Sequence, residues 1–201
     1  FAGLKAYISE PRSGEPKCNI LFFPDGYGPF SLHNQLMQVF FAENGFLVLG
    51  IDYFFGQHLT EEIMKDSRNS GFDVNAWTDN ARTRAGLEVP KWVKAAKEHY
   101  GNDKSMLLLS VGLVSAAFAH PGRRIAEEQF QRVTNNDKRF LPQARHRAGD
   151  ILHEIGATFH FRVFSGVGFT IRGDHKVENS RWAEEKAATT VLSFFSRCLT
   201  A

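Results

Sequence analysis

The sequence predicts an α/β fold, with one domain over residues 1–201 built on a doubly wound, mostly parallel sheet. Two observations support this prediction. Short, continuous apolar runs recur along the chain and are typical of strands buried on both faces. Turn residues and segments with helical spacing separate these runs. The length of 201 residues favours one domain with a sizeable core.

The first part of the chain predicts three strands and one helix. Gly3 to Ser9 alternates apolar and polar residues, as an edge strand does, whereas Cys18 to Phe23 and Phe46 to Ile51 read as buried strands. Between the buried strands, Ser31 to Asn44 predicts a helix that ends before Gly45. The apolar face expected for this helix consists of Leu32, Leu36, Val39 and Phe40. This order of elements predicts a parallel crossover.

The rest of the chain predicts further alternation of helices and strands. Thr60 to Thr83 is polar and predicts a lid-like excursion with short helices. Val89 to Tyr100 predicts a helix with Pro90 in its first turn and with Trp92 and Ala96 on its apolar face. Later strands are expected at Met106–Leu109, Val111–Ala119 and Phe159–Phe164, and later helices at Pro142–Ile155 and Trp182–Leu199.

Composition argues against several functional classes. The formal net charge is +2, which gives no reason to expect nucleic acid or an anionic membrane as a partner. No apolar run reaches the roughly 20 residues that span a bilayer. The two cysteines, Cys18 and Cys198, form neither a disulfide framework nor a metal-binding pattern. We therefore expect a cytoplasmic protein without metal or cofactor.

A set of short sequence words carries a resemblance to a known family. The words are Gly3–Tyr7, Pro24–Gly28, Asn34–Leu36, Asn44–Leu49, Asp52–Gly56, Phe118–Pro121, Asn136–Phe140 and Ser165–Asp174. Each is weak alone, but eight in the same order over nearly the full length are specific. The chain resembles the dienelactone hydrolase family, and in particular its fungal members. The resemblance implies an α/β-hydrolase-like fold.

The resemblance also implies hydrolysis of a small ester or lactone by a Cys–His–Asp triad, as in carboxymethylenebutenolidase. Asp137 occupies the position of the triad acid. Neither cysteine lies in the sharp strand-to-helix elbow that holds the family's nucleophile. Ser110, in Leu108-Leu109-Ser110-Val111-Gly112, is the nearest candidate, although it lacks the first glycine of the elbow. A serine at a strand end is the alternative interpretation.

The catalytic base is missing from its expected place. Members of the family have a histidine just before a Gly-Phe pair, but Val167 here runs directly into Gly168. His160 and His175 lie nearby and are interpreted as a strand residue and a loop residue. Either the natural polypeptide contains short internal segments that this sequence lacks, or the chain is a degenerate relative. The first explanation is favoured because a parallel sheet cannot easily lose an interior strand.

Four further residues are candidates for substrate binding. Arg172 matches a family arginine that holds a substrate carboxylate, and its alternative role is a surface pair with Asp174. Asp25 and Gly26 lie in a loop that resembles the family's oxyanion loop, although any strand-to-helix connection needs such a turn. Tyr53 is expected either in the pocket or in the core.

The function expected from these residues is hydrolysis of a small-molecule ester or lactone. The alternative is a non-hydrolytic relative with the same fold, either a small-molecule binding protein or a lyase or cyclase of secondary metabolism. A homodimer is left open as the assembly.

Overall fold

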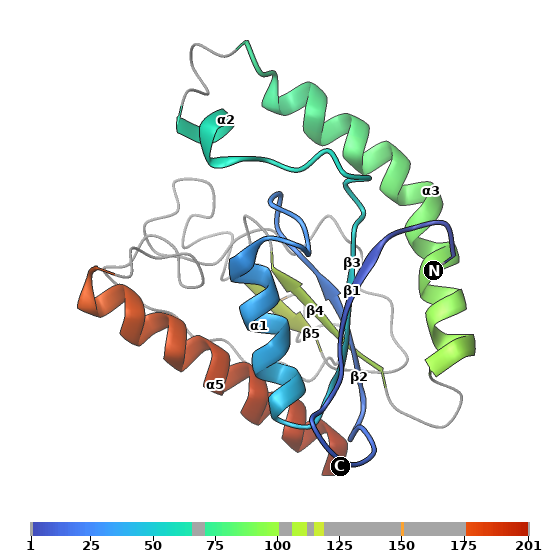
Figure 1. The fold of residues 1–201 in the computed structure, drawn as a ribbon, viewed down its shortest axis with the longest axis vertical. Coiled ribbons are helices and arrows are strands. Elements are labelled where there is room, and N and C mark those ends of the chain that lie inside the picture. The colour runs from blue at the N-terminus through green and yellow to red at the C-terminus, as the bar shows by residue number, and fades with distance from the viewer. Residues whose placement is uncertain are drawn as a thin grey trace. The chain divides into compact units, whose positions relative to one another are not determined.

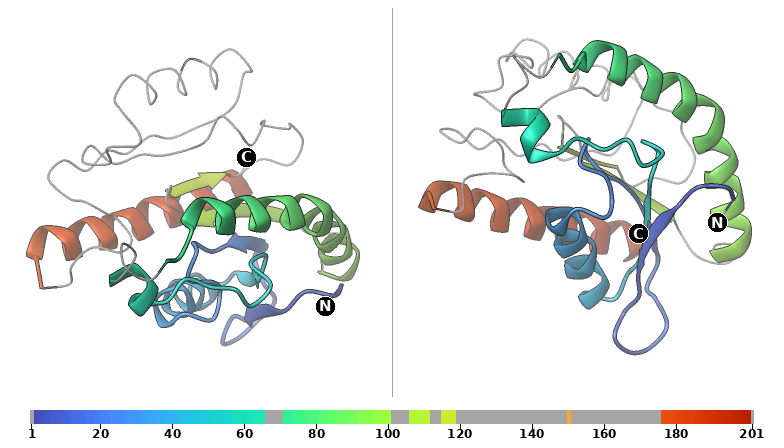
Figure 2. Two further views of the ribbon diagram at one scale, coloured as in Figure 1. Left: turned by 90° about the horizontal axis from the view of Figure 1, so that it is seen from above. Right: turned by 45° about the horizontal axis from the view of Figure 1, so that its top comes forward.

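The computed structural model describes residues 2–65, 71–100, 106–111, 115–118, 150 and 176–200. The chain divides into two compact units, Phe1–Met106 and Leu107–Ala201. Figures 1 and 2 show the helices and strands of both units along the chain. That the whole chain forms a single domain stays a prediction.

Three strands form the sheet of the first unit, in the order β1-β3-β2. They are β1 (Ala6–Ser9), β2 (Asn19–Phe23) and β3 (Leu47–Ile51). β2 and β3 are parallel, with Leu21 opposite Leu49, and β1 pairs antiparallel with β3 on its other side. Apart from Asn19 in β2, the residues of β2 and β3 are apolar or glycine, and both strands are buried almost throughout. The three predicted strands and the parallel crossover are confirmed.

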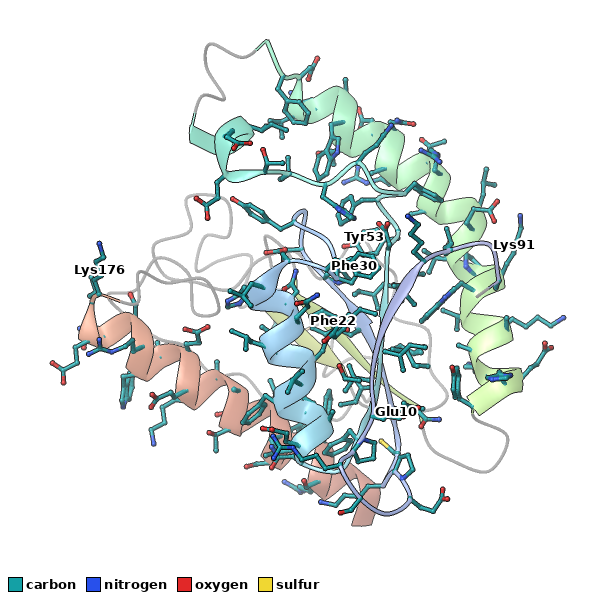
Figure 3. All side chains as sticks on the ribbon, in the orientation of Figure 1. Glu10, Phe22, Phe30, Tyr53, Lys91 and Lys176 are labelled. Atoms are coloured by element: carbon teal, nitrogen blue, oxygen red, sulfur yellow. The ribbon has the colours of Figure 1, made fainter. Side chains whose placement is uncertain are left out.

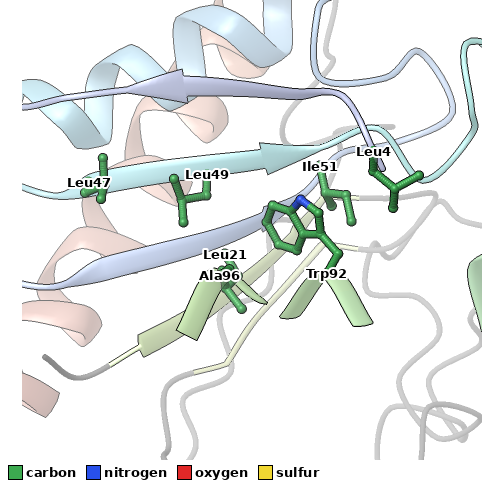
Figure 4. Packing of buried hydrophobic residues seen from close by; sticks show 7 residues of the cluster. All are labelled: Leu4, Leu21, Leu47, Leu49, Ile51, Trp92 and Ala96. Carbon is green, nitrogen blue, oxygen red and sulfur yellow. The ribbon is translucent and has the colours of Figure 1, made fainter. Parts of the chain in front are cut away.

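Helix α3 (Val74–Tyr100) packs on one face of this sheet. Trp92 and Ala96 have no exposed surface, and they form a core cluster with residues of the N-terminal segment, β2 and β3 (Figure 4). The sheet residues of this cluster include Leu47, Leu49 and Ile51, which alternate along β3. Alternate residues of a strand point to one face, so α3 covers the face of Leu47, Leu49 and Ile51. The apolar face predicted for this helix is therefore confirmed.

The start predicted for this helix is wrong, because α3 begins at Val74 rather than at Val89. Pro90 lies inside the helix and not in its first turn, and Figure 1 shows the helix curving along its length. The polar first half of α3 has no apolar stripe to reveal it. Asp73 begins the helix instead, since its carboxylate accepts hydrogen bonds from the amides of Asn75 and Ala76, both at 2.9 Å. In the described part of the expected excursion, one short helix, α2 (Glu61–Lys65), precedes α3.

Helix α1 (Leu32–Glu43) contacts the opposite face of β3, and its predicted boundaries are confirmed. The predicted apolar face is wrong: Leu32 is 71% exposed and Leu36 is 60% exposed in the structure. The buried positions are instead Asn34, Gln38, Phe41 and Ala42. Asn34 and Gln38 donate hydrogen bonds to carbonyls of the preceding loop, and these bonds fix the rotation of the helix.

In the second unit, β4 (Met106–Val111), which begins at the boundary, pairs antiparallel with β5 (Ser115–Phe118). The predicted closing helix is confirmed as α5 (Glu178–Thr200), which begins before the expected start at Trp182, and Ala183 and Phe195 are fully buried. Of the described strand pairs, β2–β3 is parallel, whereas β1–β3 and β4–β5 are antiparallel. The described strands therefore form a mixed sheet. The predicted elements Pro142–Ile155 and Phe159–Phe164 lie outside the described residues. No described helix combines the length and apolar character needed to cross a membrane.

Candidate active site

The candidate site lies where β2 and β3 end, since the loops that leave these parallel strands meet at one edge of the sheet. The Tyr53 hydroxyl, on the loop after β3, donates a hydrogen bond to the carbonyl of Pro24, on the loop after β2. The amide of Leu59 donates to the carbonyl of Gly26 at 2.7 Å. Tyr53 lies beyond Phe22 at this end of the strands (Figure 3). The two loops are therefore held together by direct hydrogen bonds.

Asp25 organises the loop after β2. Its carboxylate accepts hydrogen bonds from the amide of Tyr27 at 3.2 Å and from the side chain of Asn34 at 3.0 Å. Its carbonyl accepts from the amide of Gly28 at 2.9 Å. The amide of Gly26 has no hydrogen-bond partner within the described part of the chain. A rigid loop with one unused N–H at a sheet edge can stabilise negative charge on a bound oxygen.

Gly26 is closely covered by apolar side chains. A Cβ atom at this position would lie 2.7 Å from Leu59 Cδ1 and 3.0 Å from Trp77 Cη2. Trp77 comes from the first turns of α3 and stacks on Phe54, with 5.1 Å between ring centroids. Its indole N–H donates to the Gln57 carbonyl at 2.8 Å. Trp77, which belongs to the predicted excursion Thr60–Thr83, therefore lies at the site. Together with Leu59 it leaves no space for a larger residue at Gly26.

A histidine–carboxylate pair lies in the loop after β3. His58 Nε2 is 2.8 Å from Asp52 Oδ1, and the second carboxylate oxygen accepts from the Gly56 amide at 2.9 Å. Burial tends to raise the pKa of Asp52, but the hydrogen bond and charge of His58 and the amides of Gly56 and Phe54 hold it below its ordinary value. This carboxylate therefore contributes stability above its ordinary pKa, which is lost as pH falls through the lowered value.

Sequence reasoning missed this pair. In the sequence, Asp52 belongs to one of the words that carry the family resemblance, and no word includes His58. The signal was a histidine six positions after an aspartate that directly follows a buried parallel strand. Polar residues of such loops collect at the ligand-binding edge of the sheet.

The same loop contains a strained residue. Phe55 has φ of 57°, a left-handed conformation that is uncommon for a large side chain. The guanidinium of Arg84 lies 3.8 Å from the centre of its ring. Strain of this kind gathers at functional sites, where surrounding contacts enforce it.

A cavity of about 290 Å³ beside Phe55 and Arg84 is lined by neither Asp25 nor Gly26.

The predicted site residues are only partly brought together. Asp25, Gly26 and Tyr53 meet at the edge formed by the two loops. Asp137 and Arg172 lie outside the described residues. The backbone of Ser110 lies within β4, opposite Ala116 of the antiparallel β5. Strand structure at Ser110 agrees with the alternative interpretation of this serine, and its role as a nucleophile stays a prediction.

Cys18 is unsuited to nucleophilic catalysis. It has no exposed surface, and burial raises the pKa of its thiol to about 12. Its sulfur lies 3.8 Å from the carbonyl oxygen of Asn19, a weak contact. Cys18 is therefore a small buried residue that directly precedes β2. Within the described ranges, no group of three or more His, Cys, Asp or Glu side chains could hold a metal ion.

We expect Gly28→Ala to destabilise the site loop. Gly28 has φ of 75°, and an added Cβ would lie 2.4 Å from two ring atoms of His58. Gly56→Ala is the matched control, because Gly56 has φ of 79° but open space around its Cβ position. Backbone strain is common to both and costs about 1 kcal/mol. Urea unfolding should show a further loss of roughly 1–2 kcal/mol for Gly28→Ala alone, and equal losses would contradict the His58 contact.

Comparison with known proteins agrees with this architecture. "Dienlactone hydrolase 2" of Gibberella moniliformis is 30% identical over 197 residues, covering 96% of this chain and 84% of that protein. "Dienlactone hydrolase 1" of the same organism is 30% identical over 212 residues, with 92% and 80% covered. "Hydrolase pyvD" of Aspergillus violaceofuscus is 24% identical, with 99% and 89% covered. No family model matches the chain.

Solved structures show the same fold at low identity. The crystal structure of a "Putative Dienelactone Hydrolase" from Klebsiella pneumoniae has a TM-score of 0.61 at 11% identity, covering 94% of this chain and 92% of that one. A dienelactone hydrolase-like phosphotriesterase from metagenomic libraries has a TM-score of 0.53 at 13% identity, with 97% and 98% covered. These neighbours give the chain an α/β-hydrolase fold. With two relatives at 30% identity over most of their length, the chain belongs to the dienelactone hydrolase family.

Proposed function

We propose that this protein hydrolyses a small ester or lactone by nucleophile–His–Asp chemistry. The observation that carries the proposal is the Gly26 amide, which no described residue binds, at the edge where the parallel strands β2 and β3 end. Hydrolysis of an ester places negative charge on the carbonyl oxygen in the transition state, and a fixed N–H stabilises that charge. Membership of the dienelactone hydrolase family supports the same chemistry. The relatives are named as hydrolases, which does not favour the non-hydrolytic alternative.

Each remaining residue has a proposed role. Asp137 orients the catalytic histidine, and Ser110 is the candidate nucleophile. Arg172 pairs with a carboxylate of the substrate. Asp25 positions the oxyanion loop through its contacts with Tyr27 and Asn34. Tyr53 fixes the neighbouring loop against Pro24 and borders the substrate.

The wider proposal is a doubly wound, mostly parallel α/β-hydrolase sheet in one domain. The parallel crossover of β2, α1 and β3 supports it. We also propose that the protein works in the cytoplasm on a free small molecule, without a cofactor. Size-exclusion chromatography with light scattering would test the homodimer that the sequence leaves open.

Hydrolysis of p-nitrophenyl acetate and dihydrocoumarin by the purified chain tests the proposed function. We expect turnover by the wild type and a loss of kcat of at least about 100-fold in Asp137→Asn, because an acid that no longer orients its histidine loses most of its effect. Asp150→Asn, at an exposed position, is the control and should leave kcat unchanged. Intact mass spectrometry should accompany the assay, because a mass above 22.7 kDa would reveal additional segments. A folded wild type without turnover on either ester would contradict the proposal.

A further inference from the structure

Helix α1 turns several of its apolar side chains outward. Leu32 is 71% exposed, Leu36 is 60% exposed and Val39 is 37% exposed. The buried side of the helix includes the amides of Asn34 and Gln38, whose hydrogen bonds to the preceding loop fix this rotation. Leaving large apolar side chains in water is unfavourable, and a group of them on one element is typical of an interaction surface.

The outward residues lie on one narrow line. Leu32, Leu36, Val39 and Glu43 follow each other at intervals of four, three and four residues, and we call this line the outer seam of α1. In a helix of 3.6 residues per turn, this alternation keeps the four side chains on one stripe. It is the spacing by which one helix packs along another. A helix that lies on a lipid surface is typically rich in Lys and Arg, and α1 contains neither. The outer seam therefore favours a helix as its partner.

The charges of α1 are unequal at its two ends. Glu43, at the last position, is the single Asp, Glu, Lys or Arg of the helix. The first turn contains no acidic residue, and the Ser31 side chain does not cap it, since its hydroxyl donates to the Gly28 carbonyl at 3.2 Å. Asp25 meets Asn34 on the buried side of this end. On the outer side, the partial positive charge of the helix start can therefore accept a carboxylate from another molecule.

We propose that the outer seam of α1 is the interface of a homodimer, in which the two copies of α1 pack antiparallel about a two-fold axis. Leu36 then lies against Val39 of the partner subunit, and Glu43 lies at the end of the partner helix that begins with Leu32. A parallel arrangement would instead place the two glutamates side by side, which is unfavourable. Glu43 also pairs with Arg12, but such an exposed pair contributes little and does not hold the carboxylate in place.

The size of the seam limits the affinity of this dimer. Three turns of helix bury much less than the roughly 1,200–2,000 Å² of a standard stable interface. We therefore expect dissociation in the micromolar range rather than a permanent dimer. The inference goes beyond the proposed function and does not depend on it, because no step of ester hydrolysis enters the argument.

Sedimentation velocity of the full chain between about 2 and 200 μM tests the interface. The wild-type mass should rise with concentration toward twice the 22.7 kDa of one chain. Leu36→Glu should raise the dissociation constant at least about 10-fold, because it places a charge in the centre of the seam. Leu87→Glu is the matched control, since Leu87 lies on α3 and is 65% exposed, and it should leave the association unchanged. Circular dichroism checks that each variant is folded, and Leu36→Gln replaces Leu36→Glu if the charge disturbs folding.

Two further measurements test the antiparallel arrangement. Glu43→Lys should weaken the dimer at least about threefold, because it brings a positive charge to the positive end of the partner helix. An oxidised mixture of the Leu36→Cys and Val39→Cys variants should form disulfides mainly between the two variants, as peptide mass spectrometry would show. A wild type that stays monomeric throughout, or a dimer that Leu36→Glu and Leu36→Gln leave intact, would overturn the proposed interface. Disulfides formed mainly within each variant would overturn the antiparallel arrangement.

Discussion

Replacing Trp92 by alanine should lower the free energy of unfolding by about 3–5 kcal/mol, the range for removing a buried tryptophan. Trp92 is fully buried between α3 and the sheet. The cluster around it consists of Leu4, Leu21, Leu47, Leu49, Ile51 and Ala96 (Figure 4). Because domains are stable by only about 5–15 kcal/mol, this loss would leave the first unit marginal. Urea unfolding followed by far-ultraviolet circular dichroism measures the effect.

Trp182→Ala is the matched control for this experiment. Trp182 lies on α5 and is 47% exposed, so its removal creates no buried cavity. We expect its unfolding free energy to change by less than about 1 kcal/mol. Equal losses in the two variants would show that Trp92 does not anchor α3 to the sheet.

The parts of the fold that could be predicted are those where burial requires apolar residues at particular positions. β2 and β3 are buried almost throughout, so apolar residues predominate in both strands. The end of α1 was marked by Gly45, which has φ of 93° and costs little strain there. Trp92 and Ala96 were placed on one face because the second half of α3 has a single buried stripe.

Two features could not be predicted because polar contacts determine them. The rotation of α1 depends on Asn34 and Gln38, whose side chains bond the carbonyls of Gly28 and Pro29. Hydrophobic spacing instead favoured the face of Leu32 and Leu36, which is exposed. The first half of α3 depends similarly on capping by Asp73. Neither of these polar contacts produces a periodic pattern of apolar residues in the sequence.

The candidate site likewise contains residues whose positions could be predicted from the sequence and residues whose positions could not. The position of Asp25 and Gly26 at this edge could be predicted because a glycine-rich loop after a buried strand is typical of the ligand-binding edge of such a sheet. The contact between His58 and Asp52 joins two residues of one irregular loop, and no periodicity describes its path. The strained Phe55 between them shows how far that path departs from regular structure. Asp137 and Arg172 stay predictions from the family resemblance.

Gly50→Ala should be strongly destabilising, with a loss of about 3 kcal/mol in unfolding free energy. Gly50 lies inside β3, and a Cβ there would be 2.0 Å from Gln38 Oε1 and 2.8 Å from Gln38 Cδ. Gln38 cannot move aside freely, because it is fully buried and donates to the carbonyls of Pro29 and Asn34 at 3.1 and 3.0 Å. The glycine is thus required by the side chain that fixes α1 against the sheet. Chemical denaturation measures the loss.

A double-mutant cycle with Gln38→Ala tests that explanation. Removing the glutamine side chain opens space for the new methyl group, so Gly50→Ala should cost at least about 1 kcal/mol less in this background. Gly86→Ala is the control for the substitution itself, because Gly86 lies in α3 with nothing within 4 Å of its Cβ position. There, alanine should stabilise the helix by up to about 1 kcal/mol. Additive costs at positions 38 and 50 would show that the close approach of Gln38 is not what requires a glycine in β3.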